Sequence, residues 1–172
     1  MRKSTTLALI TTGLVALGCG SGGTDNAADT GGAADEKKAA VAKVGEPTRD
    51  GKFEFTVKSS KCGVAKVGTD LIGAKAQGQF CLITINVKNI GKEAQMFDGS
   101  SQKAYAADGT EYSADTSAAI YANKNAETFL NDINPGNQVN GVLVFDIPKN
   151  VKLTKLELHD SPFSGGVDVT LG

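Results

Sequence analysis

Few residues of this 172-residue chain could carry out chemistry, and three of them are cysteines: Cys19, Cys62 and Cys81. A thiol can be acylated, oxidised to a disulfide or bound to a metal, and its surroundings decide which of these occurs. His159, beside Asp160, is the only histidine. A blue-copper centre needs two histidines in addition to its cysteine, so the single histidine excludes that class of site. Three kinds of chemistry remain: lipid attachment, a disulfide bond and a histidine-based catalytic site.

His159 and Asp160 could be two members of a catalytic triad that is completed by a serine. Neighbouring residues of a strand point to opposite faces of the sheet, however, so the two side chains would diverge. The nearest serines, Ser161 and Ser164, fall in a predicted loop. We therefore expect no catalytic role for His159 and no catalytic residues elsewhere.

Four aspartates could bind Ca²⁺ through their carboxylate oxygens: Asp108, Asp115, Asp132 and Asp146. They do not show the dense spacing within one loop that a dedicated calcium site has. Asp108 fits a turn, Asp146 lies near the end of a predicted strand, and the other two fall in predicted loops. The glycine clusters likewise lack the strand, glycine-rich turn and helix of a phosphate loop. We therefore expect neither a metal ion nor another cofactor.

Cys19 ends a segment that resembles the signal of bacterial lipoproteins. Two basic residues precede an apolar run over residues 7–17, and Gly18 stands directly before the cysteine. In such signals the thiol receives a diacylglyceryl group before cleavage, and the lipid then holds the chain on a membrane. The apolar run is shorter than the stretch of about 20 residues that spans a bilayer. The sequence predicts a signal peptide over residues 1–18, a lipidated Cys19 and a location on the extracytoplasmic face of the cell membrane.

Cys62 and Cys81 remain as an even pair in the oxidising environment outside the cytoplasm, where disulfides persist. Their separation matches neither a redox motif with two intervening residues nor a zinc knuckle. A disulfide that closes a loop of this length stabilises a fold by about 3 kcal/mol on the chain-entropy model. We predict a structural disulfide, with two free buried thiols as the alternative.

Residues 20–43 consist mainly of glycine, alanine and polar residues and contain no aromatic side chain. Such a composition cannot bury enough apolar surface to fold, so we expect a flexible linker over residues 19–47. A tether of about 25 residues reaches roughly 25 to 30 Å on average. Without residues 1–18 the chain carries 16 basic and 19 acidic residues, which argues against a nucleic-acid partner. The lipid at Cys19 is then the expected contact with the membrane.

The strongest predicted strand covers residues 78–89. Apolar residues occupy every second position and predict one buried face: Cys81, Ile83, Ile85 and Val87. The opposite face begins with Phe80 and Leu82 and then becomes polar. We therefore expect this strand to be buried on both faces at one end and on one face at the other.

The rest of the chain alternates short strand patterns with turn residues. The other predicted strands cover residues 52–58, 62–67, 93–97, 102–106, 110–113, 139–147, 153–159 and 167–171, and a glycine-rich loop is expected before Gly78. Many short strands with little helical periodicity predict an all-β domain over residues 48–172, an antiparallel β-sandwich, with a barrel as the alternative. The chain has no tryptophan and its two remaining cysteines lie on neighbouring early segments, so an antibody-type domain is not expected.

Four short motifs of strand and turn residues occur in order: Val87-Lys88-Asn89-Ile90-Gly91, Asp108-Gly109-Thr110-Glu111-Tyr112 after Tyr105, Asn134-Pro135-Gly136, and residues 141–148 (Gly-Val-Leu-Val-Phe-Asp-Ile-Pro). This series resembles the bacterial lipoprotein family known as domain of unknown function 4352, which is similar to immunoglobulin-like secreted antigens of mycobacteria. The resemblance covers residues 51–172. It implies an immunoglobulin-like β-sandwich and brings no catalytic residues.

These observations favour a membrane-anchored, non-catalytic module that binds a protein or an envelope component. The alternative is an enzyme or metal-binding protein whose site assembles from dispersed residues. The sequence does not distinguish a binding module from a purely structural spacer in the envelope.

Residues 114–131 form the longest region without strand alternation, and recognition residues are often displayed on long loops. Tyr121 and Phe129 lie in this region and Tyr112 flanks it, so these three are the candidate partner-binding residues. The alternative is that Tyr121 and Phe129 fold back as a cap on the core, with one helical turn over residues 117–122.

Overall fold

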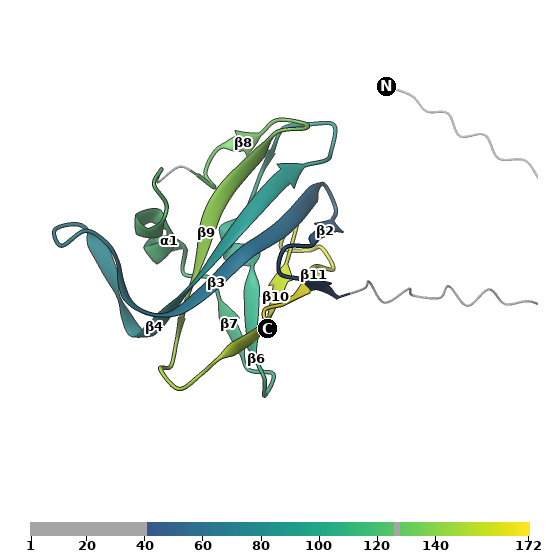
Figure 1. The fold of residues 1–172 in the computed structure, drawn as a ribbon. Coiled ribbons are helices and arrows are strands. Elements are labelled where there is room, and N and C mark those ends of the chain that lie inside the picture. The colour runs from purple at the N-terminus through teal and green to yellow at the C-terminus, as the bar shows by residue number, and fades with distance from the viewer. Residues whose placement is uncertain (1–40, 126–127) are drawn as a thin grey trace, which may run out of the picture. The chain divides into compact units, whose positions relative to one another are not determined.

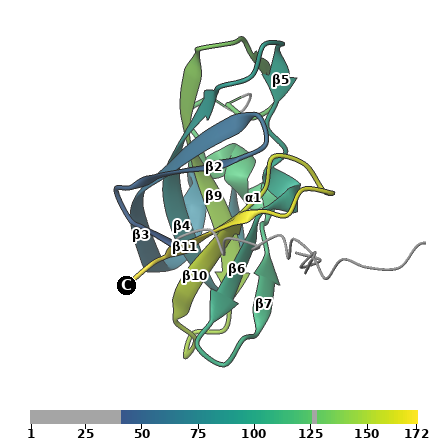
Figure 2. The same ribbon diagram turned by 90° about the vertical axis from the view of Figure 1, so that its right-hand side faces the viewer.

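The computed structural model describes residues 41–125 and 128–172, and these residues form two facing β-sheets (Figure 1). Sheet A contains, in spatial order, β1 (Ala42–Lys43), β11 (Val167–Thr170), β10 (Leu153–Leu158), β6 (Lys103–Ala106) and β7 (Glu111–Ser113) (Figure 2). Sheet B contains β2 (Pro47–Asp50), β3 (Phe53–Gly68), β4 (Gly73–Asn89) and β9 (Gln138–Ile147). A two-stranded sheet joins β5 (Gln95–Met96) to β8 (Asp132–Ile133).

Neighbouring strands pair antiparallel in all three sheets, except that β1 runs parallel to β11. Both large sheets have free edges, so the structure is a sandwich and the alternative of a closed barrel is wrong. The all-β, immunoglobulin-like antiparallel β-sandwich expected from the sequence is confirmed.

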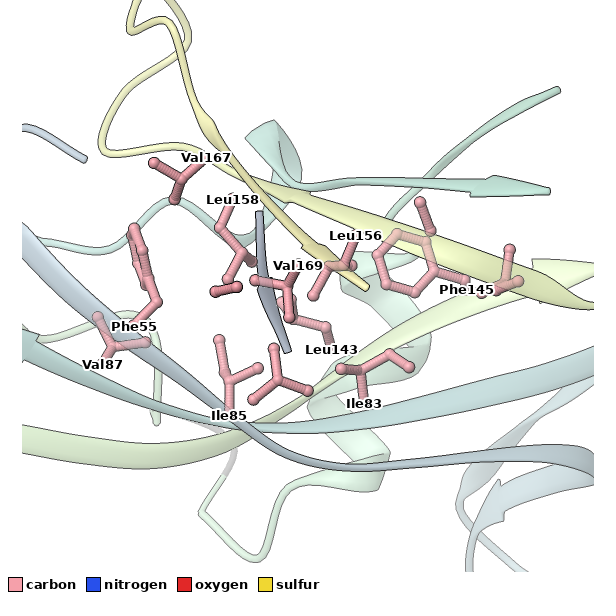
Figure 3. Packing of buried hydrophobic residues seen from close by; sticks show 14 of the residues in the cluster. Phe55, Ile83, Ile85, Val87, Leu143, Phe145, Leu156, Leu158, Val167 and Val169 are labelled. Carbon is pink, nitrogen blue, oxygen red and sulfur yellow. The ribbon is translucent and has the colours of Figure 1, made fainter. Parts of the chain in front are cut away.

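The core lies between the two sheets, where their inward-facing side chains meet (Figure 3). The four alternating residues of β4 are fully buried as predicted: Cys81, Ile83, Ile85 and Val87. Leucine and valine side chains from β10 and β11 pack against them from sheet A: Leu156, Leu158, Val167 and Val169. Period-two alternation on both sheets therefore produces one continuous apolar layer.

A second, smaller cluster covers the outer face of sheet B. Phe80 and Val144 pack there against Ala118 of helix α1 (Thr116–Ala122). The strand β4 is therefore buried on both faces at this end, as predicted from Phe80 and Leu82. The helical turn that the sequence allowed over residues 117–122 is present within α1.

The hairpin of β3 and β4 is longer than predicted. The two strands pair as far as Gly68 and Gly73, so only residues 69–72 form the turn and the expected loop before Gly78 is largely strand. Gly68 has a positive φ of 89°, which a residue with a side chain rarely adopts, and this lets the chain reverse tightly. Because small residues dominate residues 73–78, the sequence offered no apolar alternation to reveal this strand.

The sandwich also begins earlier than the predicted boundary at residue 48. Ala42 is buried and pairs with Val169, and β2 pairs with β3. Main-chain hydrogen bonds, which require no apolar pattern, hold these edge strands, so a composition-based boundary placed β1 and the first residue of β2 in the linker. The predicted signal peptide, Cys19 and residues 19–40 of the linker lie outside the described residues. Within the described residues, no helix is long and apolar enough to cross a bilayer.

Candidate functional site

Cys62 and Cys81 are joined by a disulfide between β3 and β4, as predicted. The register of the two strands shifts between Lys61 and Val64, so that Cys62 and Gly63 together lie opposite the stretch around Cys81. Gly63 has a positive φ of 84°, which is typical of a β-bulge with glycine. The bulge brings the exposed Cys62 next to the buried Cys81, and the disulfide joins the two strands midway along the hairpin.

The three aromatic residues proposed for partner binding lie in three different environments. Tyr112 on β7 is partly buried and packs against the main core. Phe129 also packs against this core, and its ring centroid lies 4.9 Å from that of Phe97. Tyr121 lies on α1 with 38% of its surface exposed. The cap alternative therefore holds for Phe129 but not for Tyr121, and the structure does not bring the three residues together.

An apolar pocket of about 340 Å³ opens between α1, the segment after β5 and the loop before β8. Its floor consists of buried residues: Phe97, Leu143 and Val144. Its rim includes three exposed apolar side chains from three segments: Met96, Ile120 and Leu130. A concave apolar surface with a rigid floor and a volume in this range is typical of a ligand or side-chain binding site.

The floor is rigid because aromatic rings support it from below. The Phe97 ring centroid lies 6.0 Å from that of Phe53 and 5.9 Å from that of Phe55 on β3. Phe129 closes one side of the pocket, and its ring occupies the space above Gly141, where any added methyl group would overlap it. Glycine at position 141 therefore makes room for the Phe129 wall.

Two carboxylates stand at the edge of this pocket. Asp98 accepts hydrogen bonds from the Ser100 N–H at 2.8 Å and from the hydroxyls of Ser100 and Ser101 at 2.6 Å each, at the start of the short helix η1 (Gly99–Ser101). Burial acts to raise the pKa of Asp98, but these hydrogen bonds outweigh it and lower the pKa below its usual value. Asp115 caps α1 by accepting a hydrogen bond from the Ala118 N–H at 2.8 Å.

A third polar side chain of the pocket, Asn123, is also held by the protein. The Asn123 side chain accepts from the Val142 N–H at 2.8 Å and donates to the Val142 carbonyl at 3.0 Å and to the Ala119 carbonyl at 2.7 Å. The lining residues include two aspartates and no lysine, arginine or histidine. The pocket therefore combines an apolar interior with a negatively charged edge.

His159 lies in a different part of the sandwich, at the end of β10. Its Nε2 is 2.8 Å from a carboxylate oxygen of Glu157, and its Nδ1 is 3.3 Å from the Ser164 hydroxyl. The Ser164 hydroxyl donates to the Ser161 carbonyl at 3.0 Å, and the imidazole packs against Gly166. The polar contacts of the imidazole are to Glu157 and Ser164 and not to Asp160, as expected from the opposite directions of neighbouring strand residues, and they attach the loop over residues 161–166 to sheet A.

The outer face of sheet A carries a network of charges around Tyr105. The Tyr105 hydroxyl donates to Glu111 at 3.2 Å, and Lys155 lies 4.2 Å from the centre of its ring. Lys155 also pairs with Asp168 at 3.0 Å. Burial, and then the negative charges of Glu157 and Glu111, raise the pKa of Tyr105. These charges neutralise one another along the sheet, so this face has no single strong sign.

Three of the four aspartates weighed as calcium ligands accept hydrogen bonds from main-chain N–H groups, and Asp132, which was expected in a loop, lies on β8. Asp108 accepts from the Thr110 N–H at 3.0 Å within its turn, and Asp146 accepts from the Gln77 N–H at 2.6 Å. Asp115 is the helix cap described above and not a loop residue. No group of three or more histidine, cysteine, aspartate or glutamate side chains suited to a metal ion occurs in the part of the chain that the structure describes.

Asn89, in the first of the four motifs, is a buried polar residue that joins two turns. Its side chain donates to the carbonyls of Glu93 and Ile133 at 2.7 Å each and accepts from the Gly91 N–H at 2.8 Å. Through these contacts Asn89 connects the end of β4 to β8, close to the segments that surround the pocket.

Sequence reasoning placed interest in residues 114–131 but missed the opposite wall of the pocket. Met96 and Phe97 come from the segment that the sequence predicted only as a short strand over residues 93–97, and Asp98 follows it directly. The sequence did contain one sign of a second wall. Ile120 and Leu130 are apolar residues in a region without strand alternation, and such residues need a neighbouring segment to cover them.

The two open sheets and the capping helix define the class of protein as a β-sandwich module. The chain belongs to the family described as domain of unknown function, DUF4352, whose sequence profile matches residues 42–169. This confirms the resemblance derived from the four motifs. No protein of curated function is similar enough in sequence to be matched with the chain.

Several solved structures share the fold. MPT63, described as a secreted protein from Mycobacterium tuberculosis, has a TM-score of 0.55 and 16% identity, over 76% of this chain and 95% of that chain. The yjhA protein from Bacillus subtilis has a TM-score of 0.52 and 16% identity, over 75% of this chain and 99% of that chain. An uncharacterized beta-sandwich protein from Clostridium difficile 630 has a TM-score of 0.50 and 14% identity, over 77% and 95% of the two chains. At these identities the similarity concerns the fold alone.

Proposed function

We propose that this protein is a lipid-anchored, extracytoplasmic module without catalytic activity that binds a protein or an envelope component through the apolar pocket beside α1. The signal-like segment that ends at Cys19 supports the anchor. The description of MPT63 as a secreted protein is consistent with an extracytoplasmic location.

The observation that carries the binding role is the exposed apolar rim around a rigid floor. Met96, Ile120 and Leu130 are exposed to water, although they surround a cavity that could cover them. Exposed apolar side chains that gather around one cavity mark interaction sites more often than scattered ones do. Asp98, Asp115 and Asn123 are already hydrogen-bonded within the protein, so they orient a ligand more readily than they transfer a proton.

The anchor is tested by replacing Cys19 with alanine and fractionating the cells. We expect the variant to leave the membrane fraction, because the diacylglyceryl group has no other attachment point in this proposal. If Cys19→Ala remains in the membrane as completely as the parent, the lipid at this residue is not the anchor.

The binding role is tested by placing a photo-reactive amino acid at Ile120 and irradiating intact cells that contain the tagged protein. We expect a specific crosslinked species that disappears when the neighbouring rim residue is changed by Leu130→Asp. The matched control places the same reagent at Lys149, an exposed residue on the turn after β9. The same species from both positions, or none from Ile120, would contradict the pocket as a binding site.

A further inference from the structure

The tip of the β3–β4 hairpin is an exposed apolar feature that the proposed function does not use. The hairpin projects beyond the body of the sandwich (Figure 1), and its turn presents Leu71 with 96% and Ile72 with 67% of their surfaces exposed. Exposing two large aliphatic side chains at the end of a projecting hairpin is unfavourable in water unless another surface covers them.

The backbone holds this tip in a defined position. The Thr69 N–H donates to the Ile72 carbonyl at 2.7 Å, and the Ile72 N–H donates to the Thr69 hydroxyl at 3.1 Å. Lower in the hairpin, Val67 is buried against the cluster that contains Ala118 of α1. The two exposed side chains therefore sit on a structured turn that is braced by α1, so little conformational entropy is lost when they are covered.

The hairpin is positively charged behind its apolar tip. Residues 66–75, which form the tip and the strand ends next to it, contain two exposed lysines and one exposed aspartate: Lys66, Lys75 and Asp70. Lys66 lies directly opposite Lys75 in the strand register and pairs with Asp70. Asp70 offsets the charge of Lys66, and Lys75 leaves this end of the hairpin with one net positive charge, which a negatively charged partner would balance.

The pocket beside α1 has the complementary properties. It is concave where the tip is convex, its floor and rim are apolar, and the charged residues at its edge are Asp98 and Asp115. Its volume of about 340 Å³ accommodates a small number of aliphatic groups. The tip therefore matches the pocket in shape, apolar character and charge.

We propose that the hairpin tip of one molecule, with Leu71 and Ile72, inserts into the apolar pocket of a second copy of this chain. The inference rests on the proposed function in that it requires the pocket to be a docking site. The contact joins two different surfaces, so one molecule can bind two neighbours.

Self-association in solution is expected to be weak. A hairpin tip buries far less than the roughly 1,200 Å² of a standard stable interface, so we expect a dissociation constant on the order of 100 µM. Attachment to a membrane would raise the effective concentration of the tip near a neighbouring pocket and favour the contact there.

The test uses sedimentation velocity on the full chain with Cys19→Ala, which removes the lipid. The tip variant carries Leu71→Asp with Ile72→Asp, and the rim variant carries Ile120→Asp with Leu130→Asp. We expect the parent to associate with increasing concentration and each variant to associate at least about tenfold more weakly, because the apolar anchors dominate small interfaces. Phe163→Asp is the matched control, since Phe163 is 97% exposed on a different loop, and it should associate like the parent.

Mixing the two variants provides the decisive measurement. The tip variant retains an intact pocket and the rim variant retains an intact tip, so the mixture should form complexes of one copy of each although neither variant associates alone. A mixture that stays monomeric, or a control that loses association equally, would refute the proposal. Circular dichroism of each variant confirms that its fold is unchanged, as expected for exposed positions.

Two further outcomes separate this inference from the proposed function. If the reagent at Ile120 crosslinks to a peptide of the same chain that contains Leu71, the self-association is supported. If it captures only a different molecule, the pocket remains a binding site and the self-association is wrong. Binding of the monomeric parent, but not of the tip variant, to vesicles of anionic phospholipid would assign the tip to lipid and would also overturn the inference.

Discussion

The wall that Phe129 provides depends on the absence of a side chain at Gly141, and this dependence can be measured. In the parent, a methyl group at position 141 would overlap the Phe129 ring, so Gly141→Ala should force the ring out of its place on the core. The φ of Gly141 is not in the positive region, so the backbone itself accepts alanine. The substitution therefore tests the packing of Phe129 and not the strand.

The packing of Phe129 sets the expected change in the free energy of unfolding for each variant. Phe129 is partly buried and forms an edge contact with Phe97, so Phe129→Ala should destabilise the fold by about 2 to 3 kcal/mol, less than a fully buried aromatic residue would. Gly141→Ala should cost about 2 kcal/mol, because it displaces the same ring. In the Phe129→Ala background the added methyl group meets no ring, and alanine restricts the unfolded chain, so it should be neutral or stabilising by about 0.5 kcal/mol.

The assay is urea unfolding of the parent, the two single variants and the double variant, followed by far-ultraviolet circular dichroism. We expect a coupling free energy of about 2 kcal/mol between the two positions. Gly165→Ala is the control, because a methyl group there meets no atom within 4 Å and the φ of Gly165 is not positive. Additive effects of Phe129→Ala and Gly141→Ala would refute the packing described for the pocket wall.

Three other predictions concern the scaffold. Replacing Cys62 and Cys81 together by alanine should lower the free energy of unfolding by about 3 kcal/mol, and non-reduced peptide mapping of the parent should show the linked peptides; two alkylated thiols without reductant would contradict the disulfide. Asn89→Ala should destabilise by about 3 kcal/mol in urea unfolding, since it leaves two carbonyls and one N–H without their partner, whereas Asn140→Ala at the exposed end of β9 should have little effect. The folded protein holds the Tyr105 proton more tightly than the unfolded chain does, so stability should be full below about pH 10 and fall as the pH rises above it; Tyr105→Phe should remove this part of the fall, and an unchanged slope would refute it.

The sequence could predict the elements whose pattern is local. Alternation over Cys81, Ile83, Ile85 and Val87 identified the central strand and its buried face, because successive side chains of any strand point to opposite sides. Turn residues separated the other strands well enough to predict a sandwich. The disulfide followed from cysteine number and the expected compartment.

The sequence could not predict features that depend on pairing at a distance. The strand from Gly73 to Gln77 and the edge strand at Ala42 have no apolar alternation, and main-chain hydrogen bonds to a neighbouring strand decide their structure.

The candidate site depends both on local sequence patterns and on contacts between distant segments. The sequence alone determined that residues 114–131 carry apolar side chains without a strand to place them, and it allowed a helical turn there. Only the tertiary structure decided that Phe129 covers the core, that Tyr121 stays at the surface and that Ile120 and Leu130 face a pocket. The opposite wall comes from the segment after β5, and its distance from α1 is set by how the sheets pair and pack. Such a pocket is a property of the assembled sandwich, because no single segment contains both of its walls.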